Sequence, residues 1–263
     1  PRNPEWSAGR IVEFAKRFPL DAVVAADEEG VVMAAVAARE LGLPHNPPEA
    51  VRVTRDKAAM RQVFADAALP QPLFRVIGAD DDPVAACSEV GFPCVVKPVS
   101  LSASRGVIRV DDIAEVADTV ARIRTITAEA GRDPSEPILA ESFVPGTEVA
   151  LEGLLVDGHL EVLALFDKPD PMNGPYFEET ILVTPSRLAH HVQDEIAAIS
   201  RAAADALGLV QGPIHAEARV DGSRVRLLEV AARSIGGLCG RTLRFGLLGT
   251  SLETMLLRSA LGY

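Results

Sequence analysis

The stretch HAEARVDGSRVRLLEVAAR, residues 215–233, constrains the fold of this chain more than any other. Polar and apolar residues alternate on both sides of an Asp-Gly turn, which is the pattern of a β-hairpin. Pairing centred near Ser223 places Glu217 and Glu229 opposite each other or nearly so. Directly opposed side chains have Cβ atoms roughly 4.5–5.5 Å apart, where like charges destabilise a sheet. This acidic pair is therefore the feature that needs an explanation.

Two explanations of the pair stay open from the hairpin alone. A bound cation reverses the repulsion, and magnesium held by one or two carboxylates plus substrate phosphates is the usual pattern at nucleotide sites. Alternatively, each glutamate forms a solvated salt bridge with Arg219, Arg226 or Arg233. The rest of the chain has to decide between a metal site and a surface network.

Composition limits the classes of partner. The 263 residues, 48% of them hydrophobic and few aromatic, suffice for one large or two smaller α/β domains. A formal charge of −11 and a pI near 5.0 argue against a general binder of nucleic acids or anionic membranes. The sequence has no apolar run of about 18 residues and no signal peptide. Three cysteines without metal-type spacing indicate a reducing compartment. We expect a cytoplasmic protein with small-molecule partners, with a homodimer as one option.

Periodicity predicts alternating helices and strands. Residues 9–18 have helical spacing, 20–26 form a short apolar strand, and an Ala-rich helix ends at Gly42. This is a β–α unit of an open α/β layer. A helix over 54–69 follows, with Thr54 as its N-cap. Further strands are expected within 91–110, 137–168 and 176–188, and further helices over 113–123, 192–209 and 250–261.

A candidate phosphate site follows the apolar run CVV. Lys97 ends this run, and the loop 100–106 consists of small and polar residues. Successive backbone N–H groups in such a loop form an anion-binding nest, and Lys97 and Arg105 add positive charge. No Walker sequence is present, and a mobile surface loop beside a solvated lysine is the alternative.

Further candidates for ligand binding are two glutamates around a Pro-Gly turn and two acids that follow an expected strand. Backbone groups near Glu141 suit a base edge, and the carboxylate of Glu148 suits a ribose, unless both acids are simply exposed at a turn. Asp27 and Glu28 lie where ligands collect in open α/β layers. The alternative is that they complement the dipole of the following helix.

An arginine and two glycines follow the hairpin. Arg233 comes four residues after Glu229 and precedes Gly236-Gly237. An arginine beside metal-binding carboxylates binds phosphoryl or acyl-phosphate oxygens, and glycines let the backbone approach a ligand closely. The alternative is an Arg–Glu structural pair followed by an ordinary turn.

The order and spacing of these segments resemble the ATP-grasp superfamily of carboxylate–amine ligases over nearly the whole chain. Within it, the chain looks most like the branch of bacterial L-amino-acid ligases (dipeptide synthases). The resemblance implies an α/β fold in which a partial N-terminal Rossmann-like (pre-ATP-grasp) layer over 1–53 precedes a two-lobed α+β ATP-grasp domain over 54–263. The small lobe covers about 92–145 and the large lobe about 146–263. The matching segments are TRDK (54–57), FPCVVKP with SASRG (92–106), ESFVPGTE (141–148) and HAEARV…LLEVAARSIGG (215–237).

The resemblance also implies a reaction and a set of roles. ATP and Mg²⁺, for which Mn²⁺ substitutes, activate a carboxylate as an acyl phosphate, which an amine attacks with release of ADP and phosphate. Glu217 and Glu229 hold the metal. Arg233 and the Gly236 backbone stabilise the acyl phosphate and the tetrahedral intermediate, and Glu28 faces the substrate amino group. ATP is contacted by Lys57, Lys97, Ser104, Arg105, Gly106, Glu141, Val144 and Glu148.

Three departures from the family pattern limit these expectations. Ala231 stands where the family usually carries asparagine, so one or two metals remain open. The phosphate loop has serines where many relatives have glycines. The N-terminal layer is short by about one β–α unit and relatives continue past the last helix, so we expect a ligase truncated at both ends. A ligase of the same mechanism acting on a purine-pathway or natural-product acid and a non-catalytic nucleotide-binding module are the alternatives.

Overall fold

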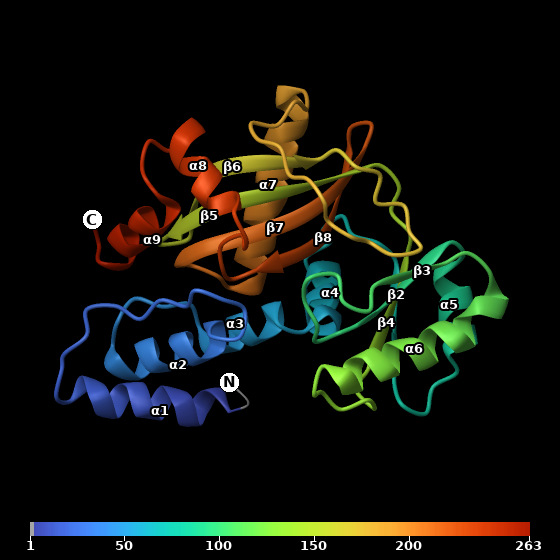
Figure 1. Cartoon of the computed structure of the whole chain (residues 1–263), viewed down its shortest axis with the longest axis horizontal. Coiled ribbons are helices and arrows are strands. Elements are labelled where there is room, and N and C mark those ends of the chain that lie inside the picture. Colours follow the sequence, from blue (N-terminus) through green and yellow to red (C-terminus); the bar gives the residue numbers. More distant parts are fainter. Residues whose placement is uncertain (1–2) are drawn as a thin grey trace.

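Two four-stranded antiparallel sheets carry the fold (Figure 1). The computed structural model describes residues 3–263, apart from the side chains of residues 245 and 246. The first sheet has the order β1-β4-β2-β3, formed by β1 (Phe74–Ile77), β4 (Ile138–Ser142), β2 (Cys94–Pro98) and β3 (Ile108–Val110). The second has the order β6-β5-β7-β8, formed by β6 (His159–Lys168), β5 (Thr147–Val156), β7 (Gly212–Asp221) and β8 (Arg224–Ala231).

Two helices, α5 (Pro83–Val90) and α6 (Val116–Glu129), pack on the first sheet and close its core. Buried Val116, Val120 and Ile123 recur with helical spacing, so one stripe of α6 faces the strands. The predicted strand–loop–strand within 91–110 and the helix over 113–123 are confirmed, the latter beginning with a 3₁₀ turn over Ile113–Glu115.

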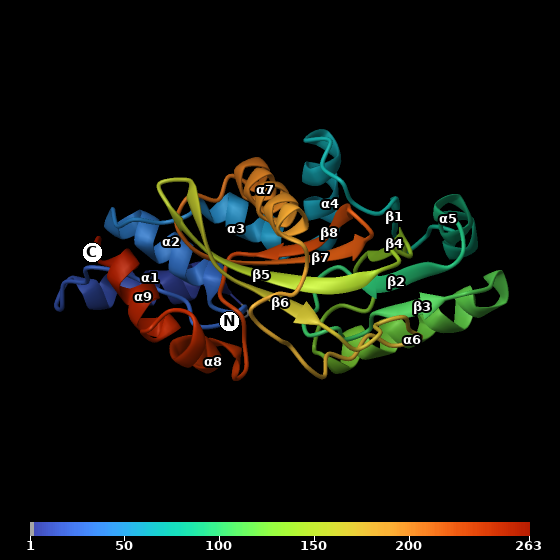
Figure 2. The same ribbon diagram turned by 90° about the horizontal axis from the view of Figure 1, so that it is seen from above.

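The second sheet is covered by α7 (His190–Leu207) on one face and by α8 (Cys239–Gly246) and α9 (Leu252–Ala260) on the other (Figures 1 and 2). The β5–β6 hairpin turns at Asp157-Gly158, as predicted, where both residues have positive φ. A single helix was expected over 250–261; α9 lies there, and α8 is an additional helix. None of the helices in the part of the chain that the structure describes is long and apolar enough to cross a membrane.

The N-terminal part consists of α1 (Pro4–Ala15), α2 (Val31–Leu41), α3 (Pro48–Thr54) and α4 (Lys57–Asp66). The strand predicted over 20–26 is wrong, because no described strand precedes Phe74 and an isolated apolar run has no neighbour to pair with. The Rossmann-like character of this layer therefore stays a proposal. Gly42 ends α2 in the left-handed conformation, as predicted.

Two other local predictions were wrong. Thr54 is not an N-cap: it ends α3, and Asp56 caps α4 by accepting bonds from two backbone N–H groups. Residues 176–188 form no strand. They belong to the irregular connection from β6 to α7, with isolated bridges from Tyr176 to Ile108 of β3 and from Val183 to Asp167 of β6.

Candidate functional site

A cavity of about 510 Å³ lies between the two sheets and gathers most of the predicted site residues. The strand ends meet here because the short connection 143–146 joins β4 of the first sheet to β5 of the second. Arg105 and Gly106 belong to the same loop as the lining residue Ser104 but do not line the cavity. The predicted residues that line it are Glu28, Lys57, Lys97, Ser104, Glu141, Val144, Glu148, Glu217, Glu229, Arg233 and Gly236.

On the side of the first sheet, one buried carboxylate faces two cations. Glu141 accepts from Arg61 Nε at 2.5 Å and from Lys97 Nζ at 2.7 Å. Burial alone would raise the pKa of Glu141, but the two cations outweigh this effect and lower the pKa to about 2. Burial holds the pKa of Lys97 below its ordinary value, although Glu141 opposes that shift. Sequence reasoning missed Arg61, whose signal was its position one turn after Lys57 on the helix.

Lys57 joins three elements at the edge of the cavity. Its Nζ donates to the carbonyl oxygen of Leu101 at 2.8 Å and to Oε1 of Glu229 at 3.1 Å. Its backbone N–H donates to the carbonyl of Val99 at 3.1 Å. The first residue of α4 is thereby tied to the loop after β2 and to the β8 strand.

The loop 100–106 contains three residues with positive φ. Ala103 has a φ of +56°, Ser104 of +53° and Gly106 of +75°. A non-glycine residue in this region costs on the order of 1–3 kcal/mol, so serine and alanine hold the loop in a conformation that glycine adopts freely. At Gly106 a Cβ would also lie 3.1 Å from Pro98 Cδ. A side chain at position 106 would therefore be both crowded by Pro98 and conformationally strained.

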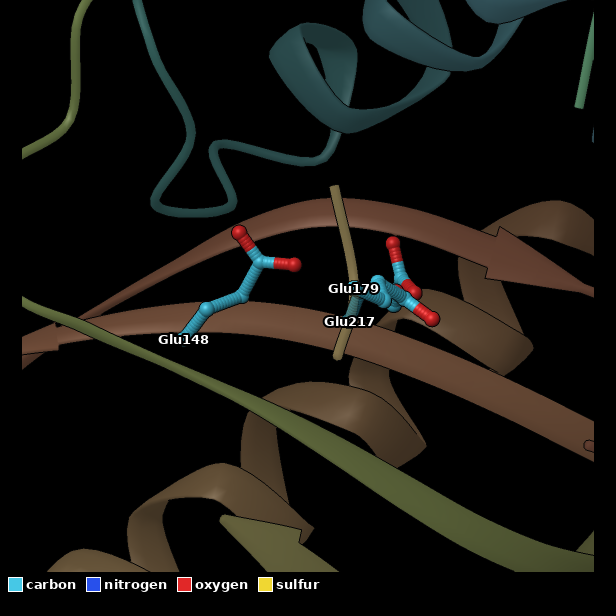
Figure 3. A group of neighbouring side chains, drawn as sticks. All are labelled: Glu148, Glu179 and Glu217. Atoms are coloured by element: carbon cyan, nitrogen blue, oxygen red, sulfur yellow. The ribbon is translucent and has the colours of Figure 1, made fainter. Parts of the chain in front are cut away.

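On the side of the second sheet, three carboxylates converge on one lysine. Oxygens of Glu148, Glu179 and Glu217 lie within 4.8 Å of one another (Figure 3). Lys168 Nζ donates to Glu148 Oε1 at 2.8 Å and to Glu217 Oε1 at 2.9 Å, and also pairs with Glu179. Burial alone would lower the pKa of Lys168, but the three carboxylates raise it above its ordinary value.

Three hard oxygen donors at one point suit a divalent cation such as Mg²⁺. Glu217 and Glu229 are opposite in the hairpin register, as predicted. Among the described side chains, however, the carboxylate group near Glu217 contains Glu179 instead of Glu229, which pairs with Lys57. Glu179 carried no motif. Lys168 had a signal similar to that of Lys97: it precedes a proline and follows an apolar run, from which Asp167 separates it.

A second network surrounds Glu217 and Glu148. His215 lies between Glu152 at Nδ1 and Glu217, whose Oε1 is 3.3 Å from Nε2. Burial lowers the pKa of His215, but hydrogen bonds and charges from both glutamates raise it to about 9. Arg219 Nε donates to Glu148 Oε2 at 3.2 Å. Every acid of this wall thus has a cationic partner.

Two predicted residues are held by arginines. Arg219 Nη1 donates to the carbonyl of Val144 at 2.8 Å, which fixes the connection between the sheets. Glu28 pairs with Arg233 and with Arg55 Nη1 at 3.0 Å. Burial raises the pKa of Glu28, but the two arginines bring it below its ordinary value. Arg55 lay inside the TRDK segment without being assigned a role.

Comparison with known proteins gives the chain its relatives. A family model described as ATP-grasp domain matches residues 90–242, more than half of the chain. The alanine–anticapsin ligase of Bacillus subtilis (strain 168) is 30% identical over 244 residues, covering 86% of this chain and 51% of that protein. The L-amino acid ligase structure from Bacillus licheniformis is similar at a TM-score of 0.81 and 29% identity, covering 99% of this chain and 61% of that chain. The chain thus spans about half the length of the curated relative that it matches.

A third likeness shows the fold alone. The biotin carboxylase domain of the Hydrogenobacter thermophilus 2-oxoglutarate carboxylase, solved as a dimer with MgADP, ADP and bicarbonate, has a TM-score of 0.78 at 18% identity, covering 97% of this chain and 57% of that chain. The expected α/β fold class and the resemblance to the L-amino-acid ligase branch are confirmed. On the family match and the shared architecture, the chain belongs to the ATP-grasp family.

Proposed function

We propose that this chain is the nucleotide-binding and catalytic part of a ligase that joins a carboxylate to an amine. It uses ATP with Mg²⁺, forms an acyl phosphate, releases ADP and phosphate, and takes amino-acid-like substrates. The observation that carries this proposal is the cavity between the sheets, where cations gather on one wall and carboxylates on the other. Membership of the ATP-grasp family and similarity to two amino-acid ligases support it.

The nucleotide occupies the cavity with its phosphates toward Lys57, Lys97 and the loop 100–106. These groups offer two ammonium groups and the backbone N–H groups of a loop of small residues, which suit an anion. Base and ribose lie along the β4–β5 connection, near Glu141, Val144 and Glu148. The internal partners of these residues are exchanged for ligand contacts when the nucleotide binds.

Magnesium belongs on the second wall. Glu217 and Glu229 would hold it, Glu179 offers a further carboxylate beside Glu217, and Mn²⁺ substitutes. When bound, the ion supplies positive charge that neutralises the phosphate oxygens during phosphoryl transfer. Ala231 offers no ligand atom, so this chain relies on carboxylates alone.

The remaining residues serve the chemistry. A carboxylate oxygen attacks the γ-phosphorus and the bond to ADP breaks; the amine then attacks the carbonyl carbon, and phosphate leaves with that oxygen. Arg233 and the N–H of Gly236 stabilise the negative charge that develops on the carbonyl oxygen. Glu28, held between Arg55 and Arg233, orients the amine and takes its proton.

An isotope experiment tests the proposal directly. With an ¹⁸O-labelled carboxylate substrate, we expect one label in the released phosphate, and ADP release that depends on both acid and amine. AMP with pyrophosphate, or label only in the amide, contradicts an acyl-phosphate ligase. Nucleotide binding without turnover for every acid–amine pair favours a non-catalytic module, and turnover only with other acids favours the purine-pathway or natural-product alternative.

Three broader expectations belong to the same proposal. The chain divides into the N-terminal layer over 1–53 and an ATP-grasp domain over 54–263, whose lobes are built around the two sheets. It assembles as a homodimer, by analogy with the carboxylase domain solved as a dimer. It acts in the cytoplasm on small molecules. Limited proteolysis, sedimentation and fractionation test these points separately.

A further inference from the structure

Two buried side chains beside the cavity have no part in the proposed chemistry. Glu152 of β5 is 1% exposed and does not line the cavity. His215 of β7, also buried, lies directly across from it in the sheet register. A carboxylate removed from water costs free energy unless its oxygens accept hydrogen bonds. The partners of this pair therefore indicate what it does.

Each oxygen of Glu152 has its own donor. Oε1 faces Nδ1 of His215, and Oε2 accepts from the backbone N–H of Ile235 at 2.8 Å. The other ring nitrogen of His215 lies 3.3 Å from Oε1 of Glu217. Carboxylates only accept, so each ring nitrogen acts as a donor in this arrangement. A continuous chain of hydrogen bonds thus runs from Glu217 to Ile235.

The far end of this chain is a segment without regular structure. Residues 234–237 lie between β8 and α8, outside any helix or strand. Gly236 and Gly237 add conformational freedom, and Gly237 has a φ of +64. The direction of the Gly236 N–H is therefore not set by a helix or a sheet ladder. Two hydrogen bonds restrain the residues before it: Ile235 N–H donates to Glu152, and Arg233 Nη1 donates to the carbonyl of Ser234 at 3.0 Å.

We propose that Glu152 and His215 are positioning residues that fix the segment 234–237 relative to Glu217. The proposal rests on the proposed function, in which Glu217 holds the metal and the Gly236 N–H stabilises the reacting carbonyl. Neither residue contacts the reacting atoms; each acts through a group that does. Loss of such an outer partner typically costs about 10–100-fold in metal affinity or activity, and here we expect the loss in kcat.

Three variants separate the two halves of this series of hydrogen bonds, the half between His215 and Glu217 and the half between His215, Glu152 and Ile235. Glutamine at position 152 has one carbonyl oxygen in place of two acceptors, so Glu152→Gln loses at least one bond. His215→Gln places an N–H donor near the Nε2 position and keeps the bond to Glu217. His215→Asn places its donor near the Nδ1 position and keeps the bond to Glu152. The exposed histidine at the start of β6 provides the matched control, His159→Gln.

Hydrogen–deuterium exchange and kinetics on the full chain give the readouts. We expect faster exchange in peptides covering 233–239 for Glu152→Gln and His215→Gln, and wild-type exchange there for His215→Asn and His159→Gln. All three site variants should lower kcat about 10–100-fold with the KM for ATP changed by less than about twofold. His159→Gln should match the wild type in both measurements.

Two outcomes overturn the proposal. Exchange in 233–239 that is unchanged in Glu152→Gln and His215→Gln shows that the pair does not restrain the segment. Equal effects of His215→Gln and His215→Asn, with faster exchange throughout the second sheet, show a purely structural core. Exchange needs no turnover, so a wild-type chain that never releases ADP contradicts the proposed function while leaving this test intact.

Discussion

The two walls of the cavity treat charge in opposite ways. On the first sheet, a single carboxylate, Glu141, lies between Arg61 and Lys97. On the second sheet, three carboxylates share Lys168. Including Glu152, Arg219 and His215, the second wall has four carboxylates and three cationic groups. The first wall therefore has cationic charge to spare, and the second wall has acidic charge to spare. The first wall is buried, whereas on the second wall Glu217 is half-buried and Glu179 is exposed, so solvent partly screens the acidic excess there.

This difference indicates which wall receives which ligand. A buried excess of positive charge is relieved by an anion, and a buried excess of negative charge by a cation. The first wall thus suits phosphate oxygens, and the second suits a divalent metal. The separation of positive and negative charge between the two walls involves few groups. Each wall combines residues from several distant parts of the chain.

The largest expected effect is on the second wall, through Lys168→Met. Removing one partner of a buried ion pair typically destabilises a protein by about 3–5 kcal/mol, and here three carboxylates lose their shared cation. The melting temperature without metal should fall well below that of the wild type. Because a ligand that binds the folded state stabilises it, Mg²⁺ should raise the melting temperature of this variant more than that of the wild type. Lys168→Arg keeps the charge and is the control; equal Mg²⁺ shifts in Lys168→Met and wild type would contradict the comparison.

The next effect is on turnover. Glu217→Gln and Glu229→Gln should each lower kcat by about 10²–10³-fold, the usual loss when one charge-stabilising group is removed, while the fold stays intact by circular dichroism. The measurement is ADP release with total Mg²⁺ close to total ATP. Glu161→Gln, an exposed acid of β6, should keep wild-type turnover. Wild-type turnover in either site variant under these conditions refutes the assignment of the metal to this hairpin.

On the first wall, Lys97→Met should weaken the binding of ATP rather than the binding of the metal. A charge-assisted hydrogen bond contributes about 1.5–3 kcal/mol, so the dissociation constant for ATP should rise roughly 10–100-fold. Isothermal titration with and without Mg²⁺ measures this, and the exposed Lys16→Met is the control. If Lys97→Met impaired Mg²⁺ binding and left ATP binding unchanged, the two walls would have been assigned the wrong way round.

The smallest expected effect is on the pH dependence of stability, which has opposite signs for Glu141 on the first wall and His215 on the second. The pKa of Glu141 is lowered from 4.5 to about 2, so its contribution to stability is present above pH 4.5 and is lost as pH falls toward 2. The pKa of His215 is raised from 6.5 to about 9, so its contribution is complete below pH 6.5 and is lost as pH rises toward 9. Each slope is at most about 1.4 kcal/mol per pH unit. Urea unfolding without metal should show the acid loss reduced in Glu141→Gln and the alkaline loss reduced in His215→Gln.

Several wrong predictions have the same physical cause. Residues 20–26 and 176–188 have the composition of strands, but a strand needs a neighbour to satisfy its backbone groups. Thr54 and Asp56 are both good N-caps, and the choice between them depended on where α3 ended. Local pattern identified suitable segments, and pairing or packing decided which of them became regular structure.

The sequence by itself determined the features that depend on neighbours along the chain. The Asp-Gly turn marked the hairpin, in which a β-bulge between Glu217 and Ala218 brings Glu217 opposite Glu229. The lysine at the end of an apolar run marked the loop that follows β2. Only the tertiary structure decided which charges meet. Arg61 reaches Glu141 across 80 positions, and His215 reaches Glu152 across 63. Such pairs carry no local signal, because a buried charge selects its partner by distance in the folded core, and that distance exists only after the two sheets have packed around the cavity.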